Sequence, residues 1–119
     1  MAVGPVTLRG TAAASELQAA QEDRDAQLER LVAALRNGGG QAREVILEHA
    51  NERLLRLTRR MLRQYPQLRR WEATDDVRQN ALLRLYRSLA EVEVESARHF
   101  LNLAGTQIRR ELIDLKRHY

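Results

Sequence analysis

A chain of 119 residues, 44% of them apolar, allows one small globular domain. It contains no Cys, which excludes disulfides and thiolate chemistry. It has neither the apolar core of a signal peptide nor a run of about eighteen apolar residues, so we expect a cytoplasmic protein without a membrane span. Residues 1–50 hold five Arg and seven acidic residues, whereas residues 51–119 hold fifteen Lys and Arg and nine acidic residues. The basic second half suits a polyanion such as nucleic acid, although the surface of any Arg-rich helical protein would have the same composition.

The N-terminal third predicts a tail followed by one helix. Residues 1–14 are rich in small residues without periodicity, and we expect them to be disordered. Helical spacing of the apolar residues Leu28, Leu31, Val32 and Leu35 predicts a helix over about 15–36. Residues 37–40, Asn-Gly-Gly-Gly, should end it, since glycine adopts left-handed geometry readily.

The next segment, about 41–64, predicts a second helix that packs into a core. Its apolar stripe consists of Leu47, Ala50, Leu54, Leu57 and Met61, widened by Ile46, Leu55 and Leu62. Tyr65-Pro66 should stop this helix, because the residue before proline avoids helical backbone angles. The single tryptophan, Trp71, then lies in a linker, where we expect it to cap the core.

Residues 74–90 predict a third helix with two different faces. Thr74 is a good N-cap, and two aspartates follow it in the first turn. The core stripe should be Val77, Ala81, Leu82, Leu85 and Leu89. The other face has polar ends and an aliphatic centre, and consists of Asp76, Gln79, Asn80, Leu83 and Arg87. This face is either a solvated surface with one exposed leucine or a docking surface with an apolar centre and a polar rim.

The last segment predicts a loop and a fourth helix. Residues 90–96 alternate acidic and apolar residues, but with no partner strand they should form a loop. Ser96 should cap a helix to about His118, with a core stripe of Ala97, Phe100, Leu101, Ala104, Ile108, Leu112 and Leu115. The opposite face carries Thr106, Arg109, Arg110, Ile113, Lys116 and Arg117. Arginines so placed could bind phosphates and reach base edges, and we expect Glu111 and Asp114 to orient neighbouring arginines through local ion pairs.

Together these segments predict an all-α domain over residues 15–119, a small bundle of about four helices. We find no candidate catalytic residue, metal site or cofactor-binding motif. The three histidines have no metal-ligand spacing, and Gly38-Gly39-Gly40 lacks the strand and the Lys-Ser/Thr of a phosphate-binding loop. A binding protein is therefore favoured over an enzyme.

Two segments resemble a known family. The sequence DVRQNALLRLYR, residues 76–87, resembles the D-[LV]-V-Q-E-x-F-L-R-[LA]-[WY]-R segment of extracytoplasmic-function (ECF) sigma factors. The stretch from 99–104 through 108–114 resembles the variant pattern H-F-x-x-x-A-x-x-x-x-R-R-x-L-x-D from region two of the same family. Arg78 and Asn80 stand where the family usually has an aliphatic and an acidic residue.

The resemblance implies a transcription initiation factor of the sigma region-two fold. Asp76, Gln79, Asn80, Leu83 and Arg87 would then dock on the clamp helices of the RNA polymerase β′ subunit. Arg109, Arg110, Ile113, Lys116 and Arg117 would contact the promoter minus-ten element, with one base of the non-template strand flipped into a pocket formed partly by loop 90–96. An anti-sigma factor is a further partner that the family allows.

Two alternatives stay open at this stage. In this family a C-terminal domain reads the minus-thirty-five element, and we expect it to be absent from the chain. The chain is then either a single domain of such a factor or a stand-alone relative. The functional alternative is a helical protein-interaction or regulatory module that does not bind DNA.

Overall fold

The computed structural model describes residues 3–68 and 74–119, with side chains from residue 13 onward. Over these ranges the chain forms four helices and no strand: α1 (Val3–His49), α2 (Asn51–Leu62), α3 (Thr74–Glu91) and α4 (Ala97–His118). The prediction of an all-α fold is confirmed. Trp71, with its predicted capping role, lies outside the described residues.

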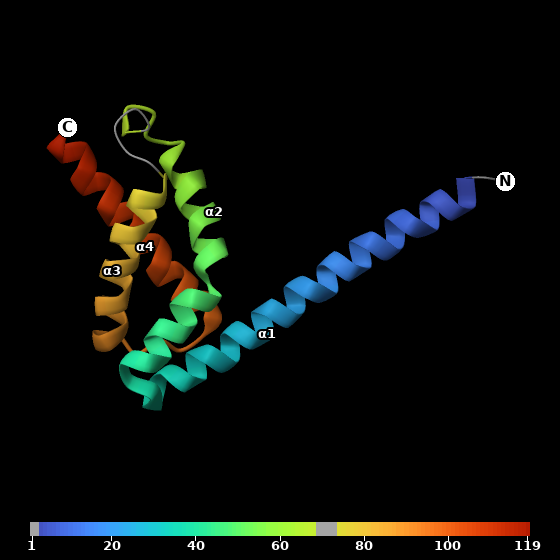
Figure 1. Ribbon diagram of the computed structural model, residues 1–119, viewed down its shortest axis with the longest axis horizontal. Helices are drawn as coiled ribbons and strands as arrows, with labels where there is room; N and C mark the ends of the chain where they lie inside the picture. Colours follow the sequence, from blue (N-terminus) through green and yellow to red (C-terminus); the bar gives the residue numbers. More distant parts are fainter. Residues whose placement is uncertain (1–2, 69–73) are drawn as a thin grey trace.

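The first half of α1 extends away from the other helices (Figure 1). It begins at Val3, earlier than the predicted start at Ser15, and the alanines at 12–14 favour this because alanine is the best helix former. Side chains 13–20 are all exposed, whereas Leu28 and Val32 are buried in the core as predicted. The predicted division between a tail at 1–14 and a domain at 15–119 stays a prediction.

The chain reverses direction in the glycine run, so that the second half of α1 packs back toward the bundle (Figure 1). Gly39 has φ 58° and ψ −146°, backbone angles that few residues other than glycine adopt. A Cβ on Gly38 would lie 2.2 Å from the Cβ of Ala42, so the turn also needs a missing side chain there. The helix end predicted at 37–40 is therefore present as a sharp kink.

The second half of α1 and α2 correspond to the single helix predicted at 41–64. The break between them is slight, because the N–H of Ala50 donates to Ile46 O at 3.0 Å and the N–H of Leu54 donates to Ala50 O at 2.9 Å. Helix α2 ends at Leu62, before Tyr65-Pro66, and Leu68 then folds back into the core.

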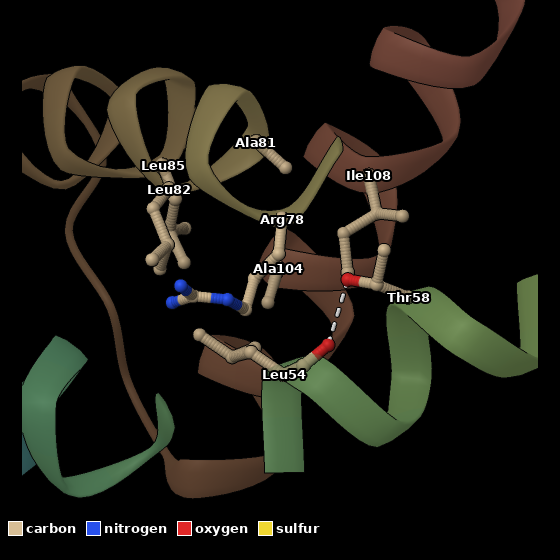
Figure 2. A pocket seen from close by; sticks show the side chains of 8 residues that line it. All are labelled: Leu54, Thr58, Arg78, Ala81, Leu82, Leu85, Ala104 and Ile108. Carbon is tan, nitrogen blue, oxygen red and sulfur yellow. Dashed lines mark hydrogen bonds between the residues drawn. The ribbon is translucent and has the colours of Figure 1, made fainter. Parts of the chain in front are cut away.

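The predicted apolar stripes meet in two buried clusters. The first draws on α1, α2, α3, α4 and the loop before α4, and consists of Leu28, Val32, Ile46, Ala50, Leu54, Leu85, Leu89, Val94, Ala97, Phe100 and Ala104. The second consists of Leu62, Leu68, Val77, Ala81, Ile108 and Leu112. Leu54, Leu85 and Ile108 belong to different helices and line one small cavity at the junction of the two clusters (Figure 2). This junction fixes α3 and α4 against α2.

Candidate functional site

One face of α3 is left uncovered by the bundle. We call it the α3 surface, and all five of its members are exposed: Asp76, Gln79, Asn80, Leu83 and Arg87. Leu83 is 59% exposed, although its neighbours Leu82 and Leu85 point into the cavity beneath the helix (Figure 2). The predicted arrangement of an apolar centre with polar ends is therefore present on the folded protein.

Hydrogen bonds to the Asp75 carboxylate order the start of the α3 surface. Its carboxylate accepts from the guanidinium of Arg78 at 2.6 Å and from the Gln79 amide at 3.2 Å. The Arg78 side chain is 15% exposed and also donates to Asn51 Oδ1 on α2. Arg78, which stands in place of a usual aliphatic residue, therefore covers the core and ties α3 to α2, and it is not a member of the exposed face.

The outer face of α4 carries a row of cations. We call this the α4 surface: Arg109, Arg110, Lys116 and Arg117 are exposed and Ile113 is half-buried among them. Most of the core stripe predicted for the other side of the helix is buried, including Phe100, Ala104, Ile108 and Leu112, whereas Leu101 and Leu115 are half-buried. The cations of the α4 surface form no ion pair among the residues that the structure describes, so their charge faces solvent.

Arg84 joins α3 to α4, and this corrects one expectation. Its Nε donates to Glu111 Oε2 at 2.9 Å and its Nη2 to Asp114 Oδ2 at 2.6 Å. Glu111 and Asp114 were expected to orient neighbouring arginines on α4, but they turn toward α3 instead. The hydrogen bond to Asp114 is the main reason that the pKa of Arg84 is raised, and the charge of Glu111 adds to it against the opposing effect of burial.

The loop before α4 is fixed at its end. The Ser96 hydroxyl caps α4 by accepting from the His99 N–H at 3.0 Å, as predicted. Nδ1 of His99 accepts from the N–H of Glu95, and the carboxylate of Glu29 on α1 accepts from the N–H of Ala97 at 2.7 Å. Val94 is buried, whereas the acidic side chains of the loop are exposed. The loop therefore enters α4 in one defined geometry.

Other site types have little support in the described ranges. No three His, Asp or Glu side chains there come together as a metal-binding group. Over the same ranges, every helix is too short or too polar to span a bilayer. Within the described ranges, α3 and α4 each present an exposed surface, and Arg84 bridges the two helices.

The comparisons with known proteins identify the family. The family model of ECF sigma factors matches residues 25–119, which include α2, α3, α4 and most of the packed part of α1. No curated protein and no solved structure matches the chain. The match covers both surfaces, and it shows that this chain belongs to the ECF sigma factors, non-enzymatic transcription initiation factors that act with RNA polymerase at promoters.

Proposed function

We propose that this chain serves as the region-two domain of an ECF sigma factor. In this proposal the α3 surface docks on the clamp helices of the polymerase β′ subunit. The observation that carries it is Leu83, which is 59% exposed at the centre of a polar face within the segment that resembles the docking helix of the family. An apolar centre with a polar rim is the usual anatomy of a protein interface.

The α4 surface is proposed to contact the promoter minus-ten element. Its cations are exposed on one side of a helix whose other side is buried, so they can bind phosphates without breaking contacts inside the protein. Loop 90–96 is proposed to receive a flipped base of the non-template strand beside this surface. Since α3 and α4 are joined through Arg84, binding of polymerase would set the position of the DNA-contacting helix.

Replacing Leu83 by Asp tests the docking surface. The change places a charge at an apolar contact centre, and we expect it to abolish capture of the chain by core RNA polymerase while the helical circular-dichroism signal is unchanged. Leu17→Asp is the matched control, because Leu17 is 71% exposed on the part of α1 that precedes the family match. If Leu83→Asp binds polymerase as well as Leu17→Asp does, the proposed interface is wrong.

Replacing Arg109 and Arg110 together by Ala tests the DNA contact. Each phosphate contact to a single strand contributes about 0.7 to the slope of log affinity against log salt, so we expect the slope to fall by about 1.4 together with the affinity. The measurement is a salt titration of the chain assembled with core polymerase and a pre-melted promoter. The exposed pair Arg56 and Arg59 on α2, replaced in the same way, gives the control for a loss of two charges. An unchanged slope in the Arg109/Arg110 variant would contradict a DNA role for the α4 surface.

A further inference from the structure

His99 closes a ring of hydrogen bonds where loop 90–96 enters α4. The Ser96 hydroxyl accepts from the His99 N–H at 3.0 Å, and Nδ1 of His99 accepts from the Glu95 N–H at 3.2 Å. The pattern is that of a capping box, in which the N-cap side chain and the side chain three residues later each accept from a backbone N–H. Here the second accepted N–H is shifted by one residue, and the acceptor is an imidazole nitrogen where such boxes usually have Glu or Gln.

Two further contacts hold the same end of the loop. Val94 is 4% exposed and belongs to the first core cluster. The carboxylate of Glu29 on α1 accepts from the Ala97 N–H at 2.7 Å. An apolar contact does not titrate, and carboxylates ordinarily gain protons only below about pH 5. Of these three contacts, the one made by His99 is therefore the one that a change of pH near neutrality can remove.

Protonation of the imidazole removes its acceptor. A neutral imidazole has one nitrogen that accepts and one that donates, whereas both nitrogens of an imidazolium donate. Two donors, Nδ1–H of His99 and the N–H of Glu95, would then point at each other. The positive charge would also lie in the first turn of α4, where the helix dipole disfavours it. Histidine is the side chain that ordinarily changes charge between about pH 5 and 8.

The charged side chains around the start of α4 decide where a protonated ring would turn. They come from the end of α3, the loop, α1, α2 and α4 itself: Glu91, Glu93, Glu95, Asp25, Glu29, Arg53 and Arg98. Asp25 is paired with Arg53 at 2.9 Å, and Glu29 accepts from the Ala97 N–H. The glutamates of the loop are exposed, and they would attract an imidazolium away from the backbone of the cap.

We propose that His99 is a positioning residue whose neutral imidazole holds loop 90–96, and that its protonation releases the loop. The latch itself depends only on the contacts of His99. Its consequence for DNA rests on the proposed function, in which the loop receives a flipped base, because a released loop no longer presents one defined pocket. Base binding is therefore favoured at neutral and weakly alkaline pH and weakened by acid.

Amide hydrogen exchange of Glu95 in the full chain tests the latch. Exchange followed by nitrogen-15 NMR gives the protection factor, the exchange rate relative to an unfolded chain at the same pH. We expect the protection of the Glu95 amide to fall about fivefold from about pH 8 to about pH 5.5, the effect of losing one hydrogen bond. The amide of Leu54, which donates to Ala50 O at 2.9 Å, is the control for a general loosening of the fold and should keep its protection.

His99→Asn separates the acceptor from its titration. Asparagine carries its carbonyl oxygen on Cγ, the atom that carries Nδ1 in histidine, and it has no charge at any pH. We expect it to keep the Glu95 amide protected throughout the titration, whereas His99→Ala, which has no acceptor, should show low protection at every pH. His49→Gln removes a histidine from the end of α1 and should titrate as wild type does. Constant protection in wild type, or an equal loss in wild type and His99→Asn, would overturn the latch.

A pre-melted promoter tests the consequence for DNA. Its non-template strand either carries or lacks the bases of the melted segment, and each form is bound by the chain assembled with core polymerase. Phosphate contacts act on both forms, so the ratio of the two affinities reports contacts to bases. We expect this ratio to fall about fivefold by about pH 5.5 in wild type, the effect of one lost base contact, and to stay constant in His99→Asn.

The two measurements separate this inference from the proposed function. If the Glu95 amide loses protection in acid while the ratio of affinities stays constant, the latch is supported and the proposed base pocket in loop 90–96 is wrong. If the Glu95 amide keeps its protection while Leu83→Asp loses polymerase, the latch is overturned and the proposed docking surface stands.

Discussion

At the scale of single residues, Arg84 bridges the two helices that carry the proposed surfaces. Its guanidinium reaches from α3 to Glu111, whose side chain is 9% exposed, and to Asp114 at the edge of the α4 surface. A planar fork can bind two carboxylates at once, which the single ammonium of a lysine does less well. The raised pKa of Arg84 means that its stabilising contribution is present below its ordinary pKa and is lost only in strong base. The bridge from Arg84 to Glu111 and Asp114 is therefore insensitive to titration of the arginine at neutral pH.

We expect Arg84→Gln to lower the free energy of unfolding by about 1–3 kcal/mol, because it leaves the Glu111 carboxylate without its charged partner in a mostly buried position. Urea denaturation followed by circular dichroism measures the change. Arg87→Gln is the control, since Arg87 is exposed on the same helix and surface substitutions usually cost less than about 0.5 kcal/mol. A similar small loss of unfolding free energy in both variants would show that the bridge made by Arg84 stabilises the fold no more than an exposed charge does.

At the scale of secondary-structure elements, one glycine run kinks α1 and so positions the two packed segments on either side of it. The run itself is visible in the sequence, so the end of the first helical segment could be predicted. The sequence could not predict which of the three glycines has the positive φ, because that depends on the residues that pack around each one. The fold assigns the positive φ to Gly39 and the close approach to Ala42 to Gly38. It also places Gly40 where a Cβ would lie 3.0 Å from the Tyr86 hydroxyl on α3.

Gly39→Ala should lower the free energy of unfolding by about 1–3 kcal/mol, because φ 58° with ψ −146° lies in a region that residues with a Cβ rarely adopt. Gly105→Ala makes the same chemical change in the middle of α4, where the added Cβ meets only Leu57 at 4.0 Å, and it should stabilise by up to about 1 kcal/mol. The midpoints of thermal and urea denaturation should therefore shift in opposite directions in the two variants. Shifts of the same sign would mean that the kink is not under the strain argued here.

At the scale of the whole molecule, the sequence predicted the helices and their buried faces better than it predicted which helices would contact one another. Apolar periodicity gives the face of each helix that is buried, and most of the stripes predicted for α3 and α4 are buried, whereas Leu82, Leu101 and Leu115 are half-buried. It does not say which helix a face will meet. The bridge from Arg84 to Glu111 joins residues 27 apart, and one cavity is lined by both Leu57 of α2 and Arg109 of α4. Both features arise from packing, so only the folded chain displays them.

The cavity between the two core clusters offers a test of that packing as a unit. Leu54, Leu85 and Ile108 are each 2% exposed, and each comes from a different helix. Truncation of any one to Ala should lower the free energy of unfolding by about 2–5 kcal/mol, because it enlarges a space that is already present. Leu83→Ala, at an exposed leucine of α3, is the control and should cost little.

The interaction energy between these sites tests the shared cavity more directly than the single variants do. Residues that share a cavity usually show interaction energies of about 0.5–3 kcal/mol in double-mutant cycles, whereas distant residues add within about 0.5 kcal/mol. Leu85 belongs to the first cluster and Ile108 to the second, and both line the same cavity (Figure 2). We therefore expect the double variant Leu85→Ala/Ile108→Ala to differ from the sum of the single variants by more than the additive limit. Strict additivity would show that α3 is held by two independent cores, and that the end of α3 near Val77 could loosen without disturbing Leu85.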